Sequence, residues 1–493
     1  MNARCLTFAL AGCLTLAGCA IGPDYARAPT AAPDAYRHAP APSMQADPDI
    51  AWWRAFGDPV LASLVDEAVR NNYDARVAAA RLEQYRGQLE AARAGLFPQI
   101  GASFGASRER RSVFAGTPLA GFDGPDNQFQ LRGSVSWEID LWGKIRRQTE
   151  AARANLWAAE YARRGVALSL AASVAQGYLS LRGLDAQLAI AQQTLDARAH
   201  ALDIFKLRYA HGVISEMELS QARDDYYATQ AAIPPLRASI AQTENALSVL
   251  LGRAPGPIAR GQPIGALTPP PLGADTPVAL VNRRPDLLQA EQAAVAANAL
   301  VGAAEALYLP SLDLGAFIGQ AAGTMGGLWH GASRIWGLSA GVAQPIFQGG
   351  AIHGQVRAAR SQSDQARLAY QGAVLSALAE VDTAYATTRE AESRLASLDN
   401  QQDALTVYSQ QSNARYESGY SSYLEVTTAQ EKLFSAQLAA VQGRVDLLSG
   451  YVTLYKALGG GWGALPDDVR SAGEPSVAAP APAPAVQRPQ GAV

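Results

Sequence analysis

An internal duplication is the feature that most constrains how this 493-residue chain can fold. Residues 151–252 align without a gap to residues 358–459, at an offset of 207 positions. Upstream the offset is 212, as in Pro98 against Pro310. Self-similarity on this scale indicates one supersecondary unit that occurs twice and packs against its copy. The most distinctive matches are Arg208, Tyr209, Gly212 and Glu218 against Arg415, Tyr416, Gly419 and Glu425.

Apolar residues recur every seven positions through much of each copy. Examples are Leu188, Leu195 and Leu202 in the first copy, and Leu433 and Leu447 in the second. A sustained seven-residue repeat predicts helices packed side by side with a left-handed supercoil. A helix over 146–209 would be roughly 95 Å long, too long to wrap a compact core. We therefore expect each helix to turn at Gly212 or Gly419 and return antiparallel. Pro234 and Pro235 predict a kink or break in the first returning helix.

Four shorter segments alternate between apolar and polar residues, which is typical of β-strands. They lie at 99–106, 128–139, 311–318 and 336–342. Ten-residue strands with one apolar face suit an outer-membrane barrel with a wet lumen, although a soluble sandwich shows the same alternation. Four strands cannot close a barrel of eight or more, and open edges in lipid are costly. Several chains must then contribute; three would give twelve strands and two would give eight, and the arithmetic leaves both open.

The N-terminus has the pattern of a signal peptide followed by a lipid anchor. An apolar run from Leu6 to Leu16 follows Arg4, and the sequence Leu-Ala-Gly at 16–18 precedes Cys19 as in a lipobox. Cys13 follows the same letters but leaves a short apolar core, and an ordinary cleaved secretory signal is the other alternative. Acyl chains contribute about 0.8 kcal/mol per buried CH₂, so acylated Cys19 would hold the chain on a membrane. No apolar run of about 20 residues follows the signal, which argues against a helical crossing.

Composition excludes several other classes of protein. Lys and Arg total 41 against 44 Asp and Glu, a balance that argues against nucleic-acid binding. The three Cys lie at positions 5, 13 and 19, and the five His are scattered without ligand spacing, so we expect no metal site. Residues 101–105 match the G-x-S-x-G nucleophile pattern but lie inside an alternating strand. We expect no catalytic residues, no enzyme activity and no cofactor beyond the lipid.

These patterns divide the chain into six segments. Residues 1–18 are a lipoprotein signal peptide and 19–60 a lipidated extended segment. Residues 61–252 form the first repeat, with a helix, two strands and a long helical hairpin. A Pro/Gly-rich linker covers residues 253–278, and the second repeat covers 279–461. Residues 462–493 form a Pro/Ala-rich tail that we expect to be disordered.

Four motifs, in this order and spacing, resemble the TolC-like outer-membrane efflux factors, in particular their NodT-type lipoprotein branch. The resemblance runs from Cys19 to Gly461. It implies a mostly helical, duplicated protomer whose four strands and long antiparallel coiled-coil helices trimerise into a 12-strand β-barrel and a 12-helix α-barrel. The motifs are Gly-Cys-Ala-Ile-Gly-Pro-Asp-Tyr at 18–25, Trp-Trp-Arg-Ala-Phe-Gly-Asp-Pro at 52–59, Trp-Glu-Ile-Asp-Leu-Trp-Gly-Lys at 137–144 and Arg-Arg-Pro-Asp-Leu at 283–287.

The resemblance also implies positions for the functional sites. The turns at 209–215 and 416–422 look like the tips that meet a periplasmic adaptor, with Arg208, Tyr209, Gly212, Arg415, Tyr416 and Gly419 as the contacting residues; bland loops are the alternative. The family's gate is acidic and lies just past the second tip, where this chain has Glu425. Thr428 stands where many relatives have a second acid. A solvated glutamate on the outer face is the alternative for Glu425.

The function implied is that of the outer-membrane channel of a tripartite efflux pump. Such a channel conducts drugs or other small molecules passively from an adaptor and an inner-membrane RND-type transporter to the exterior. By resemblance to bacterial lipoproteins, Cys19 would carry N-palmitoyl and S-diacylglycerol groups, and Ala20 implies sorting to the outer-membrane lipid. A one-step protein secretion channel and a structural coiled-coil lipoprotein are the alternatives.

Overall fold

The computed structural model describes residues 20–29, 33–39, 51–110, 125–270 and 277–461. Cys19, the signal peptide and the tail lie outside the described residues. The described residues form two compact units. Among the described residues, the sheet unit comprises those within 1–28, 83–158 and 290–370, and the helical unit comprises those within 29–82, 159–289 and 371–493. Each unit thus draws on both copies of the duplication.

The long helices form two hairpins of matched length. Helix α4 (Lys144–Ala210) and its copy α8 (Ala351–Glu417) each have 67 residues. Helix α5 (Glu216–Leu250) and its copy α9 (Tyr423–Ala457) each have 35 residues. Every boundary in the second hairpin lies 207 residues after its counterpart, so the expected duplication and antiparallel hairpins are confirmed. Among the described residues, no helix combines the length and apolar character needed to cross a membrane.

Shorter helices complete each copy. Helices α2 and α3 precede the first sheet segment, and α6 and α7 precede the second. Single turns of 3-10 helix occupy four further places. The bounds are α2 Pro59–Asn71, α3 Tyr73–Ala94, α6 Pro277–Leu280, α7 Pro285–Glu305, η1 Ile264–Ala266, η2 Ala306–Tyr308, η3 Gly326–Trp329 and η4 Gly331–Ser333.

The Pro234-Pro235 pair does not break its helix. Helix α5 continues through both residues, so the expected break is wrong. Each proline removes a backbone donor, but the helix has long flanking segments and buries Ile233 immediately before the pair. Most helical stability in proteins comes from packing of a buried face, which here outweighs the local cost of the prolines.

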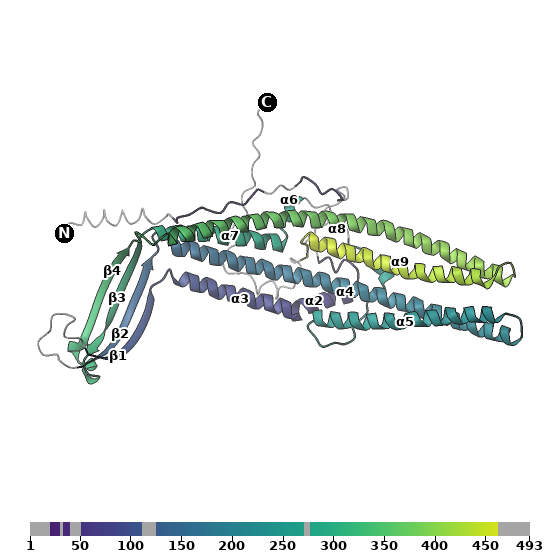
Figure 1. The fold of residues 1–493 in the computed structure, drawn as a ribbon, viewed down its shortest axis with the longest axis horizontal. Helices are drawn as coiled ribbons and strands as arrows, with labels where there is room; N and C mark the ends of the chain where they lie inside the picture. The colour runs from purple at the N-terminus through teal and green to yellow at the C-terminus, as the bar shows by residue number, and fades with distance from the viewer. Residues whose placement is uncertain (1–19, 30–32, 40–50, 111–124, 271–276, 462–493) are drawn as a thin grey trace, which may run out of the picture. The chain divides into compact units, whose positions relative to one another are not determined.

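The four alternating segments form one antiparallel sheet in the order β1-β2-β3-β4 (Figure 1). The strands are β1 Gln99–Glu109, β2 Asp126–Ile139, β3 Ser311–Ala322 and β4 Arg334–Ala343. The register places Ser103 opposite Arg132, and Arg132 opposite Gly319. Since paired residues share a face, one alternation runs unbroken across all four strands. The predicted four-strand contribution of the protomer is confirmed.

Asp58 organises the core of the helical unit. Its carboxylate is 1% exposed and caps α2 by accepting the Val60 N–H at 2.9 Å. The second oxygen accepts the Tyr178 hydroxyl at 2.6 Å and the Gln262 N–H at 3.0 Å. An aspartate at an N-cap satisfies donors that the helix cannot satisfy itself. Asp58 thereby ties α2 to α4 and to the Pro/Gly-rich segment after α5.

Candidate functional site

The first hairpin tip is a glycine-capped helix end. Gly212 follows α4 with φ of 72°, a conformation that glycine adopts without steric cost. Its N–H donates to the Tyr209 carbonyl at 2.9 Å, and the Val213 N–H donates to the Arg208 carbonyl at 2.9 Å. This pair of bonds is the Schellman motif, which satisfies the last free carbonyls of a helix.

The second tip repeats that geometry. Gly419 has φ of 78°; its N–H donates to the Tyr416 carbonyl at 2.9 Å, and the Tyr420 N–H donates to Arg415 at 2.8 Å. The six residues singled out as tip residues therefore build the two turns through their backbone. Their side chains differ in exposure, since Tyr209 is exposed and Tyr416 is half-buried.

Beyond the turns, both tips present apolar side chains to the surroundings. Val213 and Met217 are about two-thirds exposed on the first tip, and Tyr420 and Leu424 are well exposed on the second. Exposed apolar patches rimmed by polar residues are typical of interaction sites. The tips thus have the surface character of a contact site.

The two equivalent glutamates past the tips have different environments. Glu218 closes a capping box with Ser215: it accepts the Ser215 N–H at 2.8 Å, and Ser215 Oγ accepts the Glu218 N–H at 3.3 Å. Ser422 begins α9 at the matching position but makes no side-chain cap. Within the described residues, the carboxylate of Glu425 forms no hydrogen bond or ion pair. The duplication therefore leaves one carboxylate engaged in its helix and the other free.

Thr428 lies one turn beyond Glu425 on α9, and both residues are half-buried. Residues three apart on a helix share a side, so the structure places both predicted gate positions on the same side of α9. A hydroxyl at position 428 adds no charge beside the free carboxylate.

An aromatic cluster joins the two hairpins just behind the tips. Phe205 of α4 is 4% exposed, with its ring centroid 4.3 Å from that of Tyr423 and 6.5 Å from that of Tyr416. Arg208 Nη1 donates to the Tyr416 hydroxyl at 3.5 Å. Leu202, Leu219, Ala222 and Val426 complete the buried cluster. We call this set the junction cluster; it fixes the first hairpin against the second.

A buried ion pair borders the junction cluster. Arg198 of α4, 7% exposed, has Nη1 2.8 Å from Oδ1 of Asp225 on α5. The other oxygen of Asp225 is buried without a hydrogen bond among the described residues. Burial raises the pKa of Asp225 despite Arg198, and Asp224 and Glu431 add to that rise. Burial, together with the nearby Asp225 charge, also raises the pKa of Tyr423 to about 12. The junction therefore contains a titratable carboxyl group.

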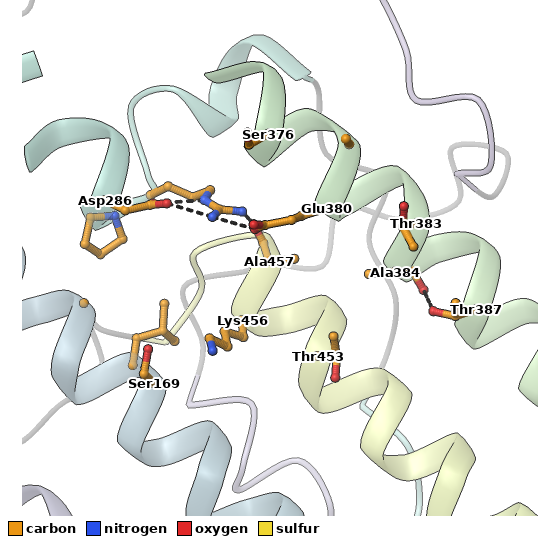
Figure 2. Close-up of a pocket in the computed structure, with 15 residues that line it drawn as sticks. Ser169, Asp286, Ser376, Glu380, Thr383, Ala384, Thr387, Thr453, Lys456 and Ala457 are labelled. Atoms are coloured by element: carbon orange, nitrogen blue, oxygen red, sulfur yellow. Dashed lines mark hydrogen bonds and ion pairs between the residues drawn. The ribbon is translucent and has the colours of Figure 1, made fainter. Parts of the chain in front are cut away.

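The helical unit contains a groove of about 820 Å³, which is lined by residues of α4, α8 and the end of α9 (Figure 2). Arg284 spans one end of it: its guanidinium donates to both Asp286 oxygens at 3.0 and 2.8 Å and lies 2.7 Å from Glu380. It also donates to the Ala457 carbonyl at the end of α9 at 3.1 Å. A cation there complements the helix dipole. The sequence analysis identified Arg284 only as part of the Arg-Arg-Pro-Asp-Leu motif at 283–287 and assigned it no structural role.

The N-terminal segment is pinned to the sheet unit directly after the predicted anchor. The Ile21 N–H donates to the Trp142 carbonyl at 3.0 Å, and Arg147 pairs with Asp24 at 2.9 Å. Arg27 pairs with Glu291 through two bonds of 2.6 Å. These contacts connect the first and third sequence motifs. Cys19 itself lies outside the described residues, so its modification stays a prediction.

No metal centre is apparent in the part of the chain that the structure describes, where no three His, Cys, Asp or Glu side chains group closely enough to hold an ion. The G-x-S-x-G residues lie in β1, as the alternation predicted.

The chain matches known proteins over most of its length. A family model described as outer membrane efflux protein matches residues 64–253 and 276–460. The probable efflux pump outer membrane protein TtgC of Pseudomonas putida is 34% identical over 454 residues, covering 91% of this chain and 93% of that protein. The probable outer membrane lipoprotein SilC of Salmonella typhimurium is 30% identical over 459 residues, covering 92% and 97%.

Solved structures share the fold. The outer-membrane channel OprN superposes with a TM-score of 0.82 at 30% identity, covering 90% of this chain and all of that one. A crystal structure of CusC superposes with a TM-score of 0.81 at 28% identity and the same coverage. The mostly helical, duplicated protomer predicted from sequence is thereby confirmed.

Proposed function

Because this chain belongs to the outer membrane efflux protein family and is an outer-membrane component of an efflux system, we propose that three copies assemble into one conduit with a gate at Glu425. Each chain would supply four strands to a 12-strand barrel and its two hairpins to a 12-helix periplasmic cylinder. The open edges at β1 and β4 support this assembly, because unpaired strand edges are costly in lipid.

The observation that carries the gate is the difference between the two glutamates. Glu218 is engaged in its capping box, whereas Glu425 has a free carboxylate one turn past the second tip. Around a three-fold axis, three free carboxylates would repel one another and attract cations, as acidic rings do in ion channels. The neutral Thr428 leaves Glu425 as the single acid at this level of α9.

The tips are proposed to bind a periplasmic adaptor. The exposed apolar side chains of Val213, Met217, Tyr420 and Leu424 support this role, since they surround two rigid glycine-capped turns. An inner-membrane RND-type transporter would complete the pump. Relatives are named for toluene efflux and antibiotic efflux, and we propose small-molecule cargo of this kind for the present chain.

The gate is tested by a matched pair of variants, Glu425→Gln and Glu218→Gln, in planar-bilayer recordings of the purified trimer. Glu425→Gln should change conductance and reduce the preference for cations, because it removes the charge of the three pore carboxylates without changing the size of the side chain. Glu218→Gln should leave both conductance and stability nearly unchanged, because glutamine at this position can still accept the Ser215 N–H and close the capping box. Unchanged conductance and selectivity in Glu425→Gln would refute the gate and indicate that this side chain lies on the outer face.

The lipid anchor is proposed to be Cys19 with N-palmitoyl and S-diacylglycerol groups. The contacts of residues 21–27 support it, because they hold the chain directly after Cys19 against the turn that follows β2, the start of α4 and helix α7. Cys19→Ser should abolish labelling by a radioactive fatty acid and lipoprotein processing, while Cys13→Ser should leave both intact. Persistent labelling of Cys19→Ser would refute the assignment.

A further inference from the structure

The sheet has one face whose side chains are mostly small or polar. We call it the polar face and define it as the face that carries Ser103, Arg132 and Gly319. In the four described strands this face holds one cation, Arg132, and one aromatic ring, Phe317. Arg108 and Arg334 belong to the opposite face, because their partners in the register are Asn127 and Gln320.

Arg132 and Phe317 form a stack built into this face. The Cζ atom of Arg132 lies 3.8 Å from the centroid of the Phe317 ring, which is a close cation–π contact. The ring in turn lies against Gly337 on β4: a Cβ atom placed there would be 2.5 Å from the ring. Only glycine therefore admits the ring in this position, and the ring supports the guanidinium from below.

The guanidinium of Arg132 has no acidic partner. Within the described residues it forms no ion pair, and its Nε is buried without a hydrogen-bond acceptor. Its cross-strand neighbours, Ser103 and Gly319, are small and neutral. An arginine carries five N–H donors and cannot lose its charge, so this one retains unused capacity for an anion.

The acids of the polar face stand at its two ends. Glu109 pairs with Asp126 in the register at one end, and Glu138 pairs with Asp313 at the other. Arg132 lies between these two acidic pairs. Lys144 forms an ion pair with Glu138, so the Glu138–Asp313 end is less negative than the Glu109–Asp126 end, and Arg132 lies between the two.

We propose that Arg132, held flat on Phe317, is a binding site for carboxylate-bearing solutes on the inner wall of the channel. This rests on the proposed function, which makes the polar face the lumen wall. A guanidinium binds a carboxylate through two parallel hydrogen bonds. Because stacking on the Phe317 ring already restricts the Arg132 side chain, it loses less conformational entropy when an anion binds. The flanking acids attract cations, so within the described strands Arg132 is the point on the polar face that retains anions.

Saturation-transfer NMR on the detergent-solubilised protein tests the site independently of the gate. The probe is benzoate, and benzamide serves as its uncharged analogue. Wild type should bind benzoate in preference to benzamide. Arg132→Gln should weaken benzoate binding about fivefold or more, in line with the loss of one charged contact. Arg108→Gln removes the same charge from the opposite face and should bind benzoate as wild type does.

Two further variants separate charge from geometry. Arg132→Lys keeps the charge without the planar fork and should bind benzoate more weakly than wild type. Phe317→Leu removes the ring that orients the guanidinium and should also weaken benzoate binding. Equal binding of benzoate by wild type and Arg132→Gln, or equal losses in Arg132→Gln and Arg108→Gln, would overturn the proposal.

Bilayer recordings distinguish this failure from failure of the proposed function. With a potassium chloride gradient, Arg132→Gln should shift the reversal potential toward stronger cation preference, and Arg108→Gln should not. If the trimer conducts and Arg132→Gln binds benzoate as tightly as wild type does, the anion site is refuted and the proposed channel function is unaffected. A protein that never conducts, whatever residue stands at position 425, refutes the channel.

Discussion

Replacing Phe205 with alanine tests whether the junction cluster holds the two hairpins together. The Phe205 side chain is 4% exposed and contacts the rings of Tyr416 and Tyr423 on the other hairpin. Replacing a buried phenylalanine with alanine in a packed core lowers the free energy of unfolding by about 3–5 kcal/mol. Since the contacts belong to the tips, we expect most of this cost to appear as local opening there.

The assay is hydrogen exchange followed by mass spectrometry. An opening free energy reduced by about 3 kcal/mol corresponds to roughly 100-fold faster amide exchange. Peptides over 199–226 and 408–430 should show this acceleration, while peptides from the Asp58 core should not. Leu207→Ala is the control, because Leu207 is 64% exposed on the same helix and its loss should cost less than about 0.5 kcal/mol.

The result for the second hairpin decides between two arrangements. If Phe205→Ala accelerates exchange only in the first hairpin, the aromatic contacts do not couple the hairpins and the reasoning is refuted. If both tips open together, the junction cluster is the element that couples them.

Two other substitutions probe the tips. Burial raises the pKa of Asp225 in the folded hairpins, so the folded state binds this proton more tightly than the unfolded state does. The free energy of unfolding should therefore rise as pH falls through the raised pKa toward the unfolded value of about 3.9. Asp225→Asn should flatten that rise, measured as urea midpoints from pH 4 to 8. An unchanged pH slope in Asp225→Asn would contradict this. Gly419→Ala should destabilise the chain by about 1 kcal/mol through its positive φ alone, because no atom lies within 4 Å of the added Cβ. Gly87→Ala, also unobstructed but inside α3, should stabilise by up to about 1 kcal/mol, and equal signs for the two glycines in urea unfolding would contradict the backbone argument.

Periodicity predicted the elements well because it reports which face of an element is buried. The seven-residue repeat located the hairpins, and the constant offset of 207 residues between the two copies located both turns, at Gly212 and Gly419. Alternation located the four strands and the polar face. The break expected at the Pro234-Pro235 pair was wrong because the local cost of the prolines was weighed without the packing of the whole helix.

Side-chain pairings across long separations could not be predicted this way. Arg284 and Ala457 lie 173 positions apart, and Arg132 and Phe317 are each ordinary members of an alternating strand. The difference between Glu218 and Glu425 was hidden for the same reason: both follow a serine by three residues, and only the structure shows that one closes the capping box. Periodicity identifies a face, whereas chemistry depends on which partners meet there.

The central claim is that one chain supplies a third of the wall of a tube. Native mass spectrometry of the lipidated protein released from detergent measures this directly. A trimeric tube should give a single dominant species with the mass of three chains, stable until the detergent conditions unfold the sheet. A dominant species with the mass of one chain or two, from protein that still conducts in bilayers, would contradict it.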